Sequence, residues 1–119
     1  MYQVIFYTDK HNSCPVDEFL DRLQPKVRAK VEKWIEKLET EGPNLPRPYA
    51  DVLRNKIREL RTVFSPNHYR LLYFFLGKYI IITHGFIKKT DKIPEGEIIK
   101  AEELMKDFLK RHKEGEIKL

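Results

Sequence analysis

Basic side chains in segments typical of β-strands are the first candidates for chemistry in this chain. Arg61 and Arg70 lie in the segments "IRELR" and "HYRLLY". A third segment, "YIIITHGFIKKT", carries His84, Lys88 and Lys89 after a run of isoleucines. Guanidinium and ammonium groups bind phosphate and stabilise charge that develops on it during a reaction. These residue types therefore predict a site for a phosphate-containing ligand.

The two arginines come together if the chain between them makes a tight turn. A two-residue turn at Ser65-Pro66 pairs Phe64 with Asn67 and places Arg61 directly opposite Arg70. Like charges in opposed positions are destabilising, and an anion bound between them relieves the repulsion. A three-residue turn would instead put the two arginines on opposite faces of the sheet.

The parity of the last strand separates its two lysines. Alternate residues of a strand share a face, so His84 goes with Lys88, and Gly85 goes with Lys89. If the "GK" turn before this strand is tight, Arg70 lies opposite Gly85. This register predicts that Lys89, and not Lys88, shares the face of Arg70. A glycine in a strand also allows a close approach of another group.

A structural role is the alternative for each of these residues. The arginines could be ordinary strand residues that pair with Glu59 or Asp91. His84 could be a hydrogen-bonded residue at a strand end, and the adjacent lysines could be solvated charge. Tyr69, Tyr73 and Trp34 are expected in the core, with polar ends that find partners.

Hydrophobic periodicity and turn residues predict the elements that position these side chains. The predicted order is β-α-α-β-β-β-α, which is an α+β fold with an antiparallel sheet flanked by helices. A proline-rich loop covers residues 41–49 and "PEGEIIKAEELMKDFLKRHKEG" forms the last helix, with Gly115 suited to its end. The three strand candidates are residues 56–64, 68–76 and 79–87.

Composition limits the class of protein. The 119 residues are 41% hydrophobic, which suits one domain with its own core, residues 1–119. The apolar runs "LLYFFL" and "YIII" are too short to cross a bilayer, and a single cysteine excludes an internal disulfide. No glycine-rich phosphate loop, metal-ligand spacing or serine elbow is present. We therefore expect a cytoplasmic domain with no membrane contact, whose net charge of +5 attracts polyanions.

The segments "IRELR", "YRLLYFF" and "HGFIKKTDKIPEGEIIKA" together resemble toxins of bacterial and phage type II toxin–antitoxin modules. The resemblance is to the HigB-like, phage-derived branch of the RelE/ParE superfamily and covers roughly residues 2–110. The run from His84 to Ala101 is its most specific part. The superfamily has the same order of elements as the one predicted above.

The resemblance implies an endoribonuclease that cuts mRNA on the ribosome without a metal or cofactor. In such enzymes the ribose 2′-hydroxyl attacks the phosphate and leaves a 2′,3′-cyclic phosphate. It also implies roles for residues of this chain: catalysis and RNA contact by Arg61, Arg70, Lys88 and Lys89, proton transfer by His84, and base stacking by Phe86 or Tyr69. Glu59 departs from the RelE pattern, which tends to have a basic residue at that position.

Two other functions remain open for this resemblance. A ParE-like toxin of the same fold would inhibit DNA gyrase and cut nothing, and a degenerate toxin would only bind its antitoxin. In every case the resemblance implies a cognate antitoxin, with a helix-turn-helix in this branch. Operator DNA would be contacted only through that antitoxin, and mRNA and the ribosome would be partners of the nuclease alone.

Overall fold

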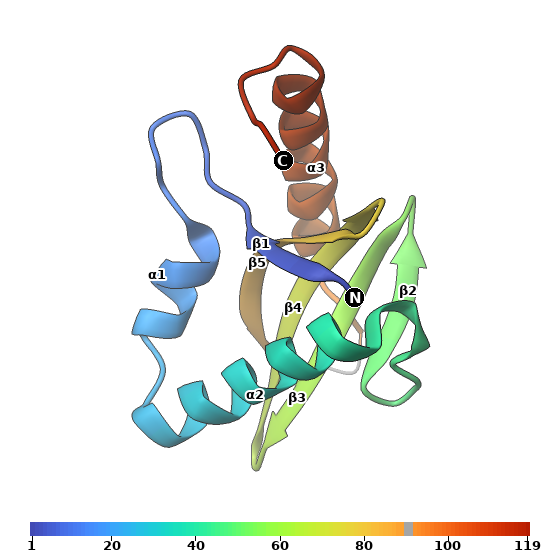
Figure 1. The fold of residues 1–119 in the computed structure, drawn as a ribbon. Helices are drawn as coiled ribbons and strands as arrows, with labels where there is room; N and C mark the ends of the chain where they lie inside the picture. The colour runs from blue at the N-terminus through green and yellow to red at the C-terminus, as the bar shows by residue number, and fades with distance from the viewer. Residues whose placement is uncertain (90–91) are drawn as a thin grey trace.

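The computed structural model describes residues 1–89 and 92–119. The elements follow the predicted order with one additional strand, and the α+β class is confirmed (Figure 1). Along the chain the elements are β1 (Gln3–Phe6), α1 (Pro15–Asp21), α2 (Pro25–Glu41), the 3-10 turn η1 (Gly42–Asn44), β2 (Ala50–Arg54), β3 (Ile57–Phe64), β4 (Asn67–Leu76), β5 (Tyr79–Lys88) and α3 (Glu95–Lys113).

The strands form one sheet in the order β1-β5-β4-β3-β2. Strands β2 to β5 are antiparallel neighbours, and the short turns of the sequence predicted this arrangement for β3, β4 and β5. β1 pairs with β5 in parallel, from Gln3 opposite Tyr79 to Phe6 opposite Ile82. The sheet is therefore mixed, because α1, α2 and three more strands separate β1 from its partner in the sequence.

Helices cover both faces of the sheet, so β4 and β5 are apolar on both sides (Figure 1). One core cluster packs α1 and α2 on one face, through Val16, Phe19, Leu20, Val31 and Leu38 against Leu60, Leu71, Tyr73, Ile80 and Ile82. The other packs α3 on the opposite face, through Ala101 and Phe108 against Ile57, Leu72, Phe74, Ile81 and Phe86. We call the second face the α3 face.

Strand β2 is absent from the predicted order. It is a short edge strand that pairs with β3 through a turn at Asn55 and Lys56, whose φ angles are both positive. Arg54 then reaches α3, with ion pairs of 2.5 Å to Glu95 and 3.0 Å to Glu102. Its sequence, "ADVLR", lacks the hydrophobic alternation that predicts a strand, and its pairing with β3 supplies the missing stabilisation.

A β-bulge in β5 changes the register on which the predicted site depends. Leu76 pairs with Tyr79, as a tight "GK" turn requires, but the register shifts by one residue between Leu72 and Tyr73. Arg70 consequently lies opposite Phe86 and not opposite Gly85. The predicted grouping of Lys89 with Arg70 is therefore wrong, because one extra residue in a strand exchanges its two faces.

The ends of α2 and α3 fall close to their predicted positions. α2 is followed by Gly42 and α3 by Gly115, two residues with positive φ angles that end the helical path. Within the described ranges, 1–89 and 92–119, no helix combines the length and the apolar character needed to span a membrane.

Candidate functional site

Nine residues of β3, β4 and β5 form three rows across the α3 face. The strand register places Glu59, Leu72 and His84 in the first row. The second row is Arg61, Arg70 and Phe86, and the third is Val63, His68 and Lys88. The Ser65-Pro66 turn pairs Phe64 with Asn67, so the predicted opposition of the two arginines is confirmed.

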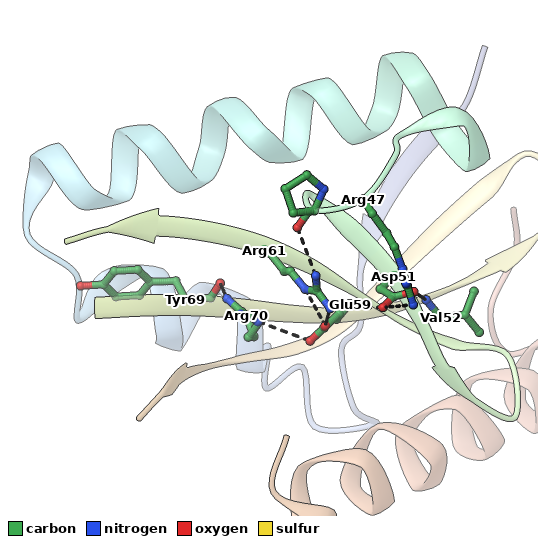
Figure 2. Close-up of polar contacts among 8 residues, drawn as sticks. Arg47, Asp51, Val52, Glu59, Arg61, Tyr69 and Arg70 are labelled. Atoms are coloured by element: carbon green, nitrogen blue, oxygen red, sulfur yellow. Dashed lines mark hydrogen bonds and ion pairs between the residues drawn. The ribbon is translucent and has the colours of Figure 1, made fainter. Parts of the chain in front are cut away.

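The carboxylate of Glu59 lies between the two arginines. Nε of Arg61 donates a hydrogen bond of 2.7 Å to Oε1 of Glu59 (Figure 2). On the other side, Nε of Arg70 lies 3.4 Å from Oε2 of Glu59. Glu59 lies in the row next to that of the arginines, on the same face of the sheet. Its side chain can therefore reach both guanidinium groups.

A second carboxylate, Asp51 of β2, extends this network at the edge of the sheet. Its Oδ2 accepts a hydrogen bond of 3.2 Å from Nη2 of Arg61 and lies 2.9 Å from Nη2 of Arg47 (Figure 2). Arg47 lowers the pKa of the Asp51 carboxyl, chiefly by a hydrogen bond. Three arginines and two carboxylates leave one net positive charge in the network.

Burial sets Arg70 apart from Arg61. Arg70 is 6% exposed and Glu59 only 1%, whereas the Arg61 side chain is 27% exposed. Burial lowers the pKa of Arg70, against the attraction of Glu59. Among the described residues, neither Oε2 of Glu59 nor Nε of Arg70 has a hydrogen-bond partner, so the two atoms attract each other without an aligned hydrogen bond.

The predicted structural role for the arginines is thus met by Glu59. Asp91, the other suggested partner, lies outside the described residues. Arg61 donates to Glu59, Asp51 and the carbonyl oxygen of Pro48, yet 27% of its side chain is exposed and its guanidinium carries five N–H groups. Pairing with Glu59 orients the arginines and does not exclude a phosphate.

A pocket of about 340 Å³ opens beside the arginines. It lies beyond the start of β2, and its lining comes from α2, the loop before β2, β3 and β4. The cationic residues of its lining are Lys30, Arg61 and Arg70. Nζ of Lys30 donates a hydrogen bond of 2.5 Å to the carbonyl oxygen of Val63. Trp34, Pro48, Tyr49, Val63 and His68 complete the lining.

His84 is buried beneath the start of α3. It is 2% exposed, with Nε2 at 3.1 Å from Oε1 of Glu97 and Nδ1 at 3.1 Å from Oγ1 of Thr83. Burial lowers the pKa of His84, helped by the charge of Lys100 and opposed by that of Glu97. His84 shares a face with the arginines but lies outside the pocket that they line.

The two lysines at the end of β5 lie in different surroundings. Lys88 is in the row of His68 and on the face of Arg70. Lys89 is exposed and lines a second pocket, of about 490 Å³, with Arg22, Lys100 and His84. Strand parity therefore separates the two lysines, and the bulge in β5 decides that Lys88 is the one on the face of Arg70.

The two aromatic residues predicted to stack on bases are both buried. Phe86 is 8% exposed and stacks on His84 at 6.0 Å between ring centroids. Tyr69 is 6% exposed and lies in the α1 and α2 core, on the face opposite the arginines. The predicted core placement of Tyr69 and Tyr73 is confirmed. Neither Phe86 nor Tyr69 offers an open ring to a base.

Gly85 makes the close approach that its position predicted, and the approaching group is α1. A Cβ at this position would lie 2.5 Å from Cδ2 of Phe19 and 2.6 Å from Cδ2 of Leu71. The glycine lets α1 pack directly on β5.

Sequence reasoning missed His68 and Tyr49, and it expected Trp34 in the core. His68 could have been found, because it is two residues before Arg70 and therefore shares its face. Trp34 lies at the margin of the core, partly buried, and stacks on Tyr49. No pattern in the sequence indicated that Tyr49 belongs to the site, because it ends a proline-rich loop whose position depends on β2.

The described ranges, 1–89 and 92–119, contain no group of three or more His, Cys, Asp or Glu side chains placed to hold a metal ion. By register and pocket lining, the candidate site consists of Arg61, Arg70, Glu59, His68 and Lys88, beside the pocket that Trp34 and Tyr49 line.

Comparison with known proteins finds one family. The family model "Phage derived protein Gp49-like (DUF891)" matches residues 18–106, which is most of the chain and includes all three rows of the candidate site. No curated protein is similar enough to count as a match. The chain belongs to the phage-derived Gp49-like family, a family of RelE/HigB-like toxins.

Proposed function

We propose that this protein is the toxin of a type II toxin–antitoxin module and cleaves mRNA bound to the ribosome. The observation that carries the proposal is the opposed pair of Arg61 and Arg70, oriented by Glu59 at the edge of an open pocket. Membership of the Gp49-like family supports it.

The proposed reaction needs three contributions from side chains. The 2′ oxygen forms a bond to phosphorus while the bond from phosphorus to the 5′ oxygen breaks. A base takes the 2′ proton, cations stabilise the charge on the phosphoryl oxygens, and an acid gives a proton to the 5′ oxygen. The products are a 2′,3′-cyclic phosphate and a 5′-hydroxyl end.

Arg61 stabilises the negative charge on the phosphoryl oxygens. Arg70 and Lys88, on the same face of the sheet, support it. Arg61 is the more exposed arginine, so it contacts the phosphate directly. Arg70 is buried against Glu59 and adds positive potential from below. Lys89 belongs to the second pocket and contacts RNA away from the scissile phosphate.

Proton transfer is better placed on His68 than on His84. An imidazole can accept and donate protons near neutral pH. His68 lines the pocket with both arginines, whereas His84 is held under α3 by Glu97. We therefore assign proton transfer to His68 and give His84 the role of positioning β5 against α3.

Replacement of Arg61 tests the proposal. Expression of the unaltered protein in bacteria should arrest growth and produce new 5′ ends within translated messages. Arg61→Ala should lower the rate of cleavage by about 10²-fold, because it removes a preorganised cation at the phosphate. Mapping of 5′ ends in total RNA, together with a growth curve, measures both effects.

Arg58→Ala is the matched control, because Arg58 is on the same strand but on the opposite face, 5.2 Å from the centre of the Phe75 ring. It should arrest growth like the parent protein. If Arg61→Ala, shown by circular dichroism to be folded, cuts as many messages as the parent, the proposed mechanism is wrong.

One observation favours a second candidate function. Glu59 partly neutralises the arginine pair, and the RelE pattern has a basic residue at that position. This arrangement suits a ParE-like toxin that inhibits DNA gyrase and does not need a strongly cationic nuclease centre. Growth arrest with intact mRNA and gyrase-dependent DNA damage would establish that function instead.

We further propose that an antitoxin encoded beside this protein neutralises it. The antitoxin of this branch would carry a helix-turn-helix and would bring operator DNA to the complex. Co-expression of the neighbouring gene should restore growth and give a complex that co-purifies. Failure of both would contradict this part of the proposal alone.

A further inference from the structure

The pocket beside the arginines has an aromatic wall that phosphate chemistry alone does not require. Trp34 of α2 and Tyr49 of the loop before β2 stack with ring centroids 4.6 Å apart and planes at 21°. Tyr49 is 41% exposed, so one ring of the pair remains open to a ligand. Nζ of Lys37 lies 5.8 Å from the centre of the Trp34 ring and adds positive charge to the pair.

Backbone hydrogen bonds hold the aromatic wall at a set position relative to the arginines. The amide of Tyr49 donates to the carbonyl oxygen of Pro46 at 2.9 Å, and the carbonyl oxygen of Tyr49 accepts from the amide of Arg61 at 2.8 Å. The side chains of Tyr49 and Arg61 therefore extend from two residues whose backbones are joined by a hydrogen bond.

The pocket combines a π-surface, apolar lining and cations at its rim. A volume of about 340 Å³ is within the usual range for pockets that take small ligands and leaves room for a base with its ribose. Bases stack on aromatic side chains, and the adjoining phosphate needs arginine. A carboxylate peptide would use the arginines but would gain little from the stacked rings.

We propose that this pocket binds one unpaired base of single-stranded RNA, against Tyr49 and Trp34, with the adjoining phosphate at Arg61. The inference rests on the proposed function, because it identifies the nucleotide that is held next to the scissile phosphate. Base-paired RNA is excluded from the pocket, since a base inside a duplex cannot reach the aromatic rings.

Trp34 provides the assay, because it is the only tryptophan in the chain. The probe is a 2′-O-methyl RNA hexamer, which retains its bases but lacks the nucleophilic hydroxyl and cannot be cut. Its matched partner is an abasic hexamer with the same sugar-phosphate backbone. The RNA hexamer should quench Trp34 fluorescence and bind about tenfold more tightly than the abasic one.

Tyr49→Ala should lower the affinity for the RNA hexamer about tenfold and leave the affinity for the abasic hexamer unchanged. Tyr49→Phe should bind both like the parent. Phe64→Ala is the matched control, because Phe64 is 37% exposed but does not line this pocket. Affinities of Tyr49→Ala should be measured by fluorescence anisotropy of labelled oligomers as well.

The outcomes separate this inference from the proposed function. Equal binding and equal quenching by the two hexamers, in a protein that cuts mRNA, would overturn the base pocket and leave the nuclease. Base-dependent quenching lost in Tyr49→Ala, in a protein that cuts nothing, would retain the pocket and overturn the nuclease.

Discussion

Glu59 is the residue on which the geometry of the arginine pair depends. It is 1% exposed and reaches both guanidinium groups, so removal of its charge leaves Arg70 buried without a counter-ion. Two opposed arginines would then repel each other at short range. The carboxylate that weakens the positive potential of the site is also what allows the arginines to be placed together.

Glu59→Ala should lower the free energy of unfolding by about 3 kcal/mol or more, because it leaves a buried positive charge uncompensated. Urea denaturation followed by circular dichroism measures the loss. Asp51→Asn is the control in the edge strand of the same network, where the side chain is 18% exposed, and it should cost less than about 1 kcal/mol. Equal losses in the two variants would show that Glu59 does not support Arg70.

At the scale of elements, the packing of α1 on β5 depends on the absence of a side chain at Gly85. Phe19 and Leu71 occupy the space that a Cβ would need. The bulge nearby sets which residues of β5 point toward α1 and which point toward α3. One irregular strand thus positions α1, the start of α3 and the row that contains Lys88.

Gly85→Ala should destabilise the fold by about 1–3 kcal/mol, because the added methyl group forces core side chains to move. Gly96 in α3 is the matched control, since a Cβ there would contact nothing within 4 Å. Gly96→Ala should raise stability by about 0.5–1 kcal/mol through helix propensity. Thermal unfolding shows whether each variant is more or less stable than the parent. A loss of stability in Gly96→Ala equal to that in Gly85→Ala would contradict the packing argument.

At the scale of the whole molecule, a buried histidine joins α3 to the sheet. His84 connects β5 to Glu97 of α3 and is buried at their interface. Burial lowers its pKa in the folded state below the ordinary value of 6.5. Well above that pH the imidazole is neutral in both states and contributes no pH dependence.

As the pH falls below about 6.5, the unfolded chain binds a proton at His84 before the folded chain does, so stability decreases. The free energy of unfolding should therefore fall between pH 7.5 and pH 5.5, a range above the titration of most carboxylates. His84→Gln, which cannot titrate, should remove this decrease. His11→Gln, at an exposed position in the loop before α1, should retain it. An unchanged slope in His84→Gln would rule out His84 as its source.

The sequence alone determined the elements that local patterns control. Alternation and periodicity predicted β3, β4, β5 and the helices, because each pattern reports which face of a segment is buried. The Ser65-Pro66 turn predicted the opposition of Arg61 and Arg70, because a two-residue turn sets the register of its own hairpin. The likeness of "HGFIKKT" to this toxin family was also readable without coordinates.

Only the tertiary structure decided how these parts meet. The bulge in β5, the edge strand β2 and the parallel pairing of β1 arise from packing between segments far apart in the sequence. They place Lys88 and not Lys89 beside Arg70, bring Tyr49 to Trp34, and bury His84 under α3. No local pattern records these contacts, because their energy depends on which surfaces remain to be covered once the local elements have formed.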